Sequence, residues 1–247
     1  MSTLKDVMII GDLHGNWAPL NSLINKKHPD IILQCGDFGW WPRMHGRPKR
    51  KIRDNLGRII KPWDQYGIKC QNSEIFWCAG NHEDWEELEL RNAVPSVIAK
   101  NIYYMKRGAI MTLPDGRIVL FMGGALSTDK NSRTPNIDWF YQELIPYSEF
   151  FKLQENKIEK IDVVISHTCP SEFNAKLSGK QPYTGWEYKF MDCSQQVLSA
   201  ILNEYKPSLW YFGHFHVTAE GKHKNTNWYC LNCPDNGSRW WRYIESV

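Results

Sequence analysis

The sequence lacks several features that would indicate a membrane, secreted or repeat protein. No apolar run in its 247 residues approaches the ~20 residues that a membrane-spanning helix needs. The opening stretch MSTLKDVMIIGD has only a short apolar segment, so we expect a cytoplasmic protein with no membrane partner. Repeats and low-complexity tracts are also missing. With 42% hydrophobic residues, the chain is expected to form one domain over residues 1–247.

The cysteines lack the spacing of a zinc site. Of the seven, Cys230 and Cys233 form one C-x-x-C pair, and no second pair or histidine pair stands in register with it. We therefore expect ordinary buried thiols rather than a zinc knuckle.

Charge is uneven along the chain. The net charge is +3, yet residues 43–61 contain eight Lys and Arg and one Asp, which leaves 22 basic and 26 acidic residues elsewhere. This segment belongs to an insertion expected at about 40–72. It is either a solvated loop or a basic wall beside a site, where Trp40, Trp41 and Trp63 could stack on the bases of a nucleotide or nucleic acid.

Strand and helix patterns alternate. Apolar runs predict strands, helical spacing of apolar residues predicts helices, and the Asp-Gly pair in LPDGR predicts a hairpin turn at 113–117. The mixture favours an α/β fold with two mixed sheets and outer helices. Strands are expected at 6–11, 29–37, 74–81 and 161–167, in NIYYM, AIMTL and RIVLFMGG, and late in the chain in SLWYFGH, WYCLN and RWWRYI. Helices are expected at 16–26, 83–91 and 194–205 and in PYSEFFKLQENKI.

Polar residues follow the apolar strands in a recurring pattern. The strand-end pairs are Gly11-Asp12, Gly36-Asp37, Gly80-Asn81, Ser166-His167 and Gly213-His214. Buried strands that deliver polar groups at their carboxyl ends are how α/β folds build sites. Glycine before the polar residue lets the chain turn sharply as it leaves the sheet.

These turns gather the candidate functional residues. They are Asp12, His14, Asp37, Asn81, His82, His167, His214 and His216, and five of the eight histidines are among them. A single Asp-x-His could be only a tight turn, but five such turns together indicate a site. Because residues i and i+2 of an extended chain point the same way, Asp12 and His14 can present both side chains to one side.

Carboxylate, imidazole and amide donors suit Mn²⁺, Fe, Zn²⁺ or Ni²⁺ better than Ca²⁺ or Mg²⁺. So many ligands exceed one tetrahedral site and fit two metals that share a carboxylate.

Five ordered blocks carry a resemblance to a known family. GDLHG, GDFG, GNHE, SH before TCP, and GHFH span residues 11–216 in the order of the calcineurin-like metallophosphoesterase superfamily. The resemblance implies a four-layer sandwich of two mixed β-sheets flanked by helices, with a dinuclear site at the strand ends. It implies one metal held by Asp12, His14 and His216, another held by Asn81, His167 and His214, and Asp37 as the bridge.

The same resemblance implies hydrolysis of a phosphate mono- or diester. A hydroxide bridging two divalent metals, manganese first with iron, zinc or nickel as alternatives, would attack phosphorus in line. His82 would donate a proton to the leaving alkoxide or stabilise the transition-state charge. The expected substrate is a nucleotide or another small phosphoester.

The second block departs from the serine/threonine and diadenosine-polyphosphate phosphatase branch, which GDLHGN and GNHE resemble. That branch reads GDxVDRG, whereas this chain reads GDFGWWP, with Trp40 in place of the carboxylate that orients the proton donor. Trp41 replaces the phosphate-gripping arginine. A standard protein phosphatase is therefore not expected, and Glu83 or Asp84 is left as the substitute partner of His82.

The blocks CGDFG and HTCP and the stretch GGALSTDKNSR at 123–133 resemble small uncharacterised bacterial and phage metallophosphoesterases. In that stretch, Lys130 and Arg133 could face a substrate phosphate, since Arg pairs bidentately with phosphate oxygens. The alternative is a surface loop with salt-bridged charges.

Two further functions stay open at this point. A nuclease could bind RNA or DNA through the basic insertion, and its activity would then fall steeply with salt. A catalytically silent binding scaffold is the other alternative, although such scaffolds usually lose ligands. The sequence leaves the oligomeric state open.

Overall fold

Two six-stranded mixed sheets form the centre of the molecule. The computed structural model describes residues 6–44, 67–70, 72–173, 192–237 and 239–245. In the first sheet the order is β12 (Trp241–Tyr243), β1 (Val7–Ile10), β2 (Ile31–Gln34), β3 (Glu74–Trp77), β5 (Ile102–Tyr104) and β4 (Ser96–Ala99). In the second it is β10 (Ala219–His223), β11 (Thr226–Cys230), β9 (Leu209–Phe212), β8 (Val163–Ser166), β7 (Ile118–Met122) and β6 (Ala109–Thr112).

The two sheets share one plan. Strands β1, β2, β3 and β5 run parallel, as do β11, β9, β8 and β7. Each sheet is closed on both sides by an antiparallel edge strand. Because the carboxyl ends of parallel strands meet at one edge of a sheet, this plan gathers the turns that follow the strands.

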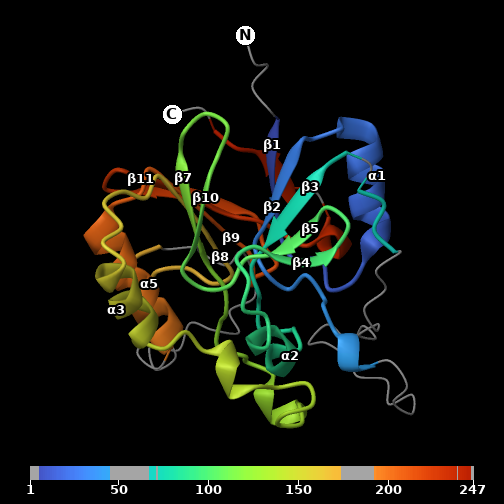
Figure 1. The fold of residues 1–247 in the computed structure, drawn as a ribbon, viewed down its shortest axis with the longest axis horizontal. Helices are drawn as coiled ribbons and strands as arrows, with labels where there is room; N and C mark the ends of the chain where they lie inside the picture. Colours follow the sequence, from blue (N-terminus) through green and yellow to red (C-terminus); the bar gives the residue numbers. More distant parts are fainter. Residues whose placement is uncertain (1–5, 45–66, 71, 174–191, 238, 246–247) are drawn as a thin grey trace.

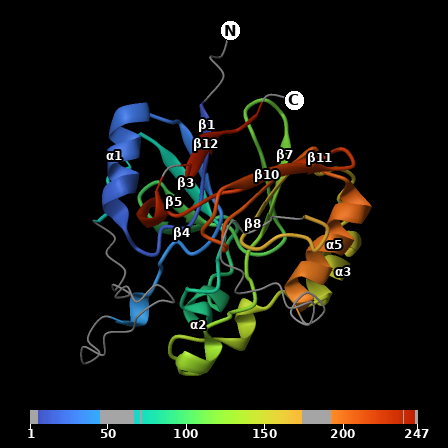
Figure 2. The ribbon, with the colours of Figure 1, turned by 180° about the vertical axis from the view of Figure 1, so that it is seen from behind.

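Helices cover the outer faces of both sheets. Figure 1 shows α1 (Trp17–Lys27) beside the first sheet, and α3 (Ser148–Glu155) and α5 (Cys193–Tyr205) beside the second. The reverse view in Figure 2 keeps the same arrangement, with α2 (Trp85–Glu89) apart from these outer helices. The short 3-10 helices are η1 (Pro42–Met44), η2 (Lys130–Ser132), η3 (Tyr141–Glu143) and η4 (Pro234–Asn236).

Alternation along the strands builds the core between these layers. In β1, Met8 and Ile10 pack with Leu20 and Ile24 of α1, whereas Ile9 packs with residues of the second sheet. The outer face of the second sheet packs against α3 and α5. Successive side chains of a strand point to opposite faces, so a wholly apolar strand fits a sheet covered on both sides. The predicted four-layer α/β sandwich is confirmed.

Two strands were not predicted. Edge strand β4 (SVIA) leaves Val97 exposed, and edge strand β10 (AEGKH) is polar and half-buried. Neither has the apolar run that marks a buried strand. The predicted insertion at 40–72 lies largely outside the described residues, as do Trp63 and the basic segment from residue 45 onward.

All seven cysteines are free thiols, and six of them are buried, as expected. Among the helices that can be described, none is long and apolar enough to cross a membrane.

Candidate metal centre

The predicted ligands all follow the carboxyl ends of parallel strands. They come after β1 (Asp12, His14), β2 (Asp37), β3 (Asn81), β8 (His167) and β9 (His214, His216). The first three strands belong to one sheet and the last two to the other. The ligands therefore meet at the edge that both sheets share.

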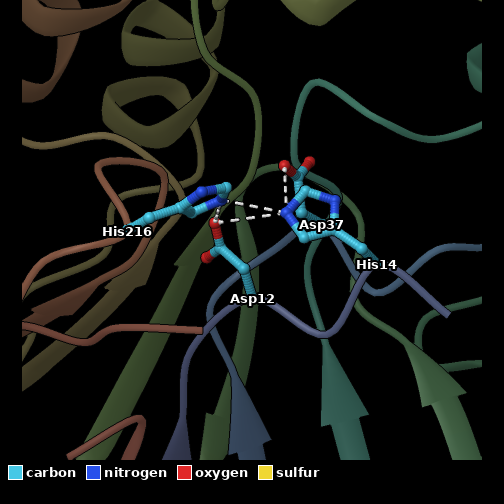
Figure 3. Close-up of side chains that lie close together, drawn as sticks. All are labelled: Asp12, His14, Asp37 and His216. Atoms are coloured by element: carbon cyan, nitrogen blue, oxygen red, sulfur yellow. Dashed lines mark hydrogen bonds and ion pairs between the residues drawn. The ribbon is translucent and has the colours of Figure 1, made fainter. Parts of the chain in front are cut away.

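Four of these side chains converge on one point. One donor atom each from Asp12, His14, Asp37 and His216 lies within 4.8 Å of the others. His216 Nε2 is 2.8 Å from Asp12 Oδ2 and 2.9 Å from His14 Nε2, and His14 Nε2 is 3.6 Å from Asp37 Oδ2 (Figure 3). Two carboxylates and two imidazoles aimed at one point form a donor set that fits a divalent transition metal.

A second group of donors lies on the other side of Asp37. His167 Nε2 is 3.0 Å from Asn81 Oδ1 and 3.4 Å from Asp37 Oδ1. The His214 ring lies beside that of His167, with their centroids 4.9 Å apart. Since Oδ2 of Asp37 faces the first group and Oδ1 the second, this carboxylate stands between them.

Neighbouring groups fix the orientation of the second set. His167 Nδ1 donates to the carbonyl oxygen of Cys35 at 2.8 Å, so Nδ1 carries a proton and Nε2 is the nitrogen that would bind a metal. Asn81 Nδ2 donates to Ser127 Oγ at 3.0 Å, which turns Asn81 Oδ1 toward His167. Ser127 in turn donates to Glu143. Both donors are therefore aimed at Asp37 by contacts within the fold.

The electrostatics of the cluster favour a cation. Burial alone would raise the pKa of Asp37, but the charges of His167, His82 and His14 outweigh it and hold that pKa well below its usual range. Burial opposes protonation of His167, yet Asp37 and Asp12 raise its pKa to about 10. The two buried carboxylates therefore stabilise positive charge close to them, and a bound divalent metal would supply that charge.

Four candidate ligands have unusual backbone conformations. The φ angles of His14, Asp37, His214 and His216 are 48°, 52°, 66° and 50°. Non-glycine residues rarely adopt this left-handed region, and such strain is concentrated at functional sites. The fold therefore holds these side chains in place at a cost in backbone energy.

Two glycines make room for the carboxylates. A Cβ at Gly80 would lie 2.1 Å from Asp37 Oδ1, and one at Gly213 would lie 2.0 Å from Asp12 Oδ1. Any larger residue would push the carboxylate away. At these two positions, glycine lets the backbone lie close to a carboxylate, in addition to allowing a sharp turn.

His82 lies beside this cluster with little contact to solvent. Its side chain is 3% exposed and its ring centroid is 5.5 Å from that of His14. Neither ring nitrogen has a hydrogen-bond partner among the described residues. Burial and the charge of Arg133 hold its pKa well below the usual range.

The substitute partners proposed for His82 are engaged elsewhere. Glu83 accepts the backbone N–H of Gly39 and of Gly80, and Asp84 pairs with Arg43. The carboxylate facing His82 belongs to Asp129, a residue that the sequence pattern did not single out. Its only signal was its place in the GGALSTDKNSR stretch.

The two predicted phosphate contacts have different surroundings. Arg133 is buried, and its guanidinium donates to the backbone carbonyls of Asp138 and Asn81 and to the carboxylate of Glu143. These contacts favour the salt-bridged interpretation of this stretch, although Arg133 is buried rather than at the surface. Lys130 is exposed in η2.

The tryptophans near the basic segment are core residues. Trp40 and Trp41 are 2% and 1% exposed and belong to the apolar cluster under α1. The expectation that they stack on bases is therefore wrong, because their faces pack against other core side chains. Arg43, at the start of the basic segment, is paired with Asp84 and Glu86.

Two solved structures share the overall fold of this chain. One solved structure matches at 15% identity and a TM-score of 0.57, covering 94% of this chain and 92% of that chain. The protein TT1561 of Thermus thermophilus matches at 12% identity and a TM-score of 0.52, covering 94% and 90%. Phosphopantetheinyl hydrolase from Mycobacterium tuberculosis aligns at 12% identity with a TM-score of 0.49, covering 100% and 98%.

A search of the curated proteins finds no significant match. The family model described as calcineurin-like phosphoesterase matches residues 5–218, which contain every residue of the candidate metal centre. The chain belongs to the calcineurin-like phosphoesterase family.

Proposed function

We propose that this protein hydrolyses phosphate mono- or diesters with two divalent transition-metal ions. The observation that carries the proposal is the convergence of Asp12, His14, Asp37 and His216 at the shared edge of the two sheets. The oriented Nε2 of His167 and Oδ1 of Asn81 on the far side of Asp37 support a second position.

The residues divide between the two positions as the family resemblance implies. Asp12, His14 and His216 would hold one ion, and Asn81, His167 and His214 the other, with Asp37 between them. Such ions, when bound, supply Lewis-acid activation of water and of the phosphoryl oxygens. We propose manganese as the first ion to test, with iron, zinc and nickel as alternatives.

His82 is proposed to act on the leaving group. Its imidazole is buried next to His14 and has no hydrogen-bond partner in the part of the chain that the structure describes, so it can turn toward a phosphoester oxygen. Because its pKa is low, the ring is neutral at pH 7 before a phosphoester binds, with one of its two nitrogens protonated. The negative charge of a bound phosphate would favour protonation of the ring and transfer of that proton to the alkoxide.

We propose a nucleotide or another small phosphoester as the substrate. The stacking that Trp40 and Trp41 would have offered to the bases of a nucleotide or nucleic acid is not available, because both are buried. Lys130, exposed in η2, is proposed as a contact for the substrate phosphate. A cytoplasmic location is part of this proposal.

The test is metal-dependent hydrolysis with a matched pair of variants. Protein stripped with EDTA is assayed on p-nitrophenyl phosphate and on its bis ester with added Mn²⁺, then with nucleotides. His216→Asn should lower turnover at limiting metal by ~100-fold. His28→Asn is the control, because His28 has nearly the same left-handed φ, 49°, at the exposed end of α1. Equal activity of the two variants, or no hydrolysis by the wild type with any metal, would refute the proposal.

A second variant tests His82. His82→Ala should keep its metal content but lose ~100-fold or more on an ester with a poor leaving group, which is typical of a lost proton donor. Near-wild-type turnover on that ester would remove His82 from the chemistry.

A further inference from the structure

The surroundings of His82 raise a separate question. The His82 side chain is 3% exposed, and neither of its ring nitrogens forms a hydrogen bond with the described residues. Such burial is costly, because buried polar groups are nearly always paired. The nearest carboxylate is that of Asp129, whose Oδ2 lies 3.7 Å from His82 Nε2. That separation is less than ~1 Å beyond an ordinary hydrogen bond.

Asp129 is itself held in place by Arg133. Its Oδ1 lies 3.3 Å from Arg133 Nη1, which leaves Oδ2 to face His82. The guanidinium of Arg133 is anchored by the carboxylate of Glu143 at 2.8 Å and by the carbonyl of Asn81 at 2.8 Å. The position of the Asp129 carboxylate therefore follows from a buried network rather than from a flexible surface side chain.

The same network reaches the metal centre by a second route. Arg133 Nη1 donates to Ser127 Oγ at 2.7 Å, and Ser127 accepts from the Asn81 amide. One short segment, residues 127–133, thus contacts both Asn81 and its neighbour His82. In each case the contact comes from a side chain of the segment, Ser127 for Asn81 and Asp129 for His82.

We propose that Asp129 is the positioning residue of His82. Its Oδ2 accepts the Nε2–H of the imidazole after the two atoms approach by less than ~1 Å from their 3.7 Å separation. This contact fixes the ring orientation and leaves Nδ1 as the nitrogen that passes a proton to the leaving oxygen. Trp40 stands where the related phosphatases are expected to carry the orienting carboxylate, so in this chain the carboxylate comes from a segment much later in the sequence. The proposal rests on the proposed phosphoesterase function.

Kinetics with two leaving groups tests the role. A positioning defect should matter most when the leaving oxygen needs help, so Asp129→Asn should lower kcat by 10–100-fold on phenyl phosphate and by less than about 3-fold on p-nitrophenyl phosphate. The control is Asp115→Asn, which also removes a carboxylate paired with an arginine, Arg117, in the exposed β6–β7 turn. Asp115→Asn should leave kcat unchanged on both phenyl phosphate and p-nitrophenyl phosphate.

A double variant separates positioning from a general structural effect. If Asp129 acts through His82, adding Asp129→Asn to His82→Ala should cost less than about 3-fold more on phenyl phosphate. A further loss as large as in the single variant would overturn the proposal. The proposal would also be overturned if Asp129→Asn lowered kcat equally on phenyl phosphate and p-nitrophenyl phosphate, or on neither ester.

A spectroscopic readout keeps this test apart from the proposed function. Long-range ¹H–¹⁵N spectra of the Zn²⁺-loaded protein with a bound phosphate report which nitrogen of His82 carries the proton. Nε2–H in the wild type and a changed pattern in Asp129→Asn support the proposal, and identical patterns overturn it. If the wild type hydrolyses no ester, the phosphoesterase function fails, and these spectra still decide whether Asp129 orients His82.

Discussion

Replacing Gly213 by alanine tests how tightly the fold is built around its candidate metal ligands. The new Cβ would lie 2.0 Å from Asp12 Oδ1, whereas ordinary contact begins at 3.4 Å, so the carboxylate must withdraw by more than about 1 Å. Gly213 does not have a left-handed φ, so alanine is compatible with its backbone. The perturbation therefore falls on Asp12 and not on the chain at residue 213.

The displacement has two consequences for the site. Asp12 Oδ2 would leave its position 2.8 Å from His216 Nε2, and the backbone N–H of His214 would lose an acceptor now 3.0 Å away. A shift of ~1 Å in catalytic geometry can cost ~100-fold in rate. We expect metal affinity to fall by at least 10-fold and kcat/KM on bis-p-nitrophenyl phosphate by ~100-fold.

The assay pairs metal content with turnover and uses a second glycine as control. Metal per chain is measured after equilibrium dialysis against Mn²⁺, and folding is followed by thermal unfolding. A Cβ at Gly116 would meet no described atom within 4 Å, but the φ of this residue is +88°. Gly116→Ala should therefore cost about 1 kcal/mol of stability with no loss of activity. A folded Gly213→Ala protein with wild-type metal content and turnover would refute the reasoning.

Two predictions concern stability. Burial raises the pKa of Asp192, at the N-terminus of α5, from 3.8 to about 6, so the folded state prefers the protonated form and stability is lost as pH rises through that range. Asp192→Asn keeps a side-chain oxygen that caps the helix but removes the charge. The difference in unfolding free energy between this variant and the wild type should therefore rise, by at most about 3 kcal/mol, from pH 4 to pH 7. Parallel pH profiles of the two proteins would contradict this. Trp41→Ala should cost 3–5 kcal/mol in urea unfolding, as expected for a core aromatic, against less than about 0.5 kcal/mol for the exposed Tyr141→Ala. A small loss of stability in Trp41→Ala would indicate that this ring lies at the surface, as first expected.

The central strands and the ligand turns could be predicted because their signals are local. An apolar run such as VMII must be covered on both faces, and a Gly-polar pair after it marks the strand end. Edge strands β4 and β10 escaped prediction because an edge strand needs neither burial nor alternation. The approach of Asp129 to His82 also escaped, because it depends on how segment 127–133 packs across the end of β3.

The buried tryptophans illustrate the opposite error. Trp40 and Trp41 stand next to a basic segment, and their sequence position indicated a binding surface. Packing decided otherwise, since Trp40 lies 6.3 Å from Trp77 and Trp41 lies 6.3 Å from Phe140, ring centre to ring centre, in the core. Neighbouring charge along the chain does not determine which face of an aromatic ring is free.

A crystal of the protein soaked in Mn²⁺ and measured at the manganese absorption edge tests the dinuclear centre most directly. We expect two anomalous peaks on either side of Asp37, one against His14 and His216 and the other against Asn81 and His167. A single peak, or none at metal concentrations that support hydrolysis, would contradict the dinuclear centre.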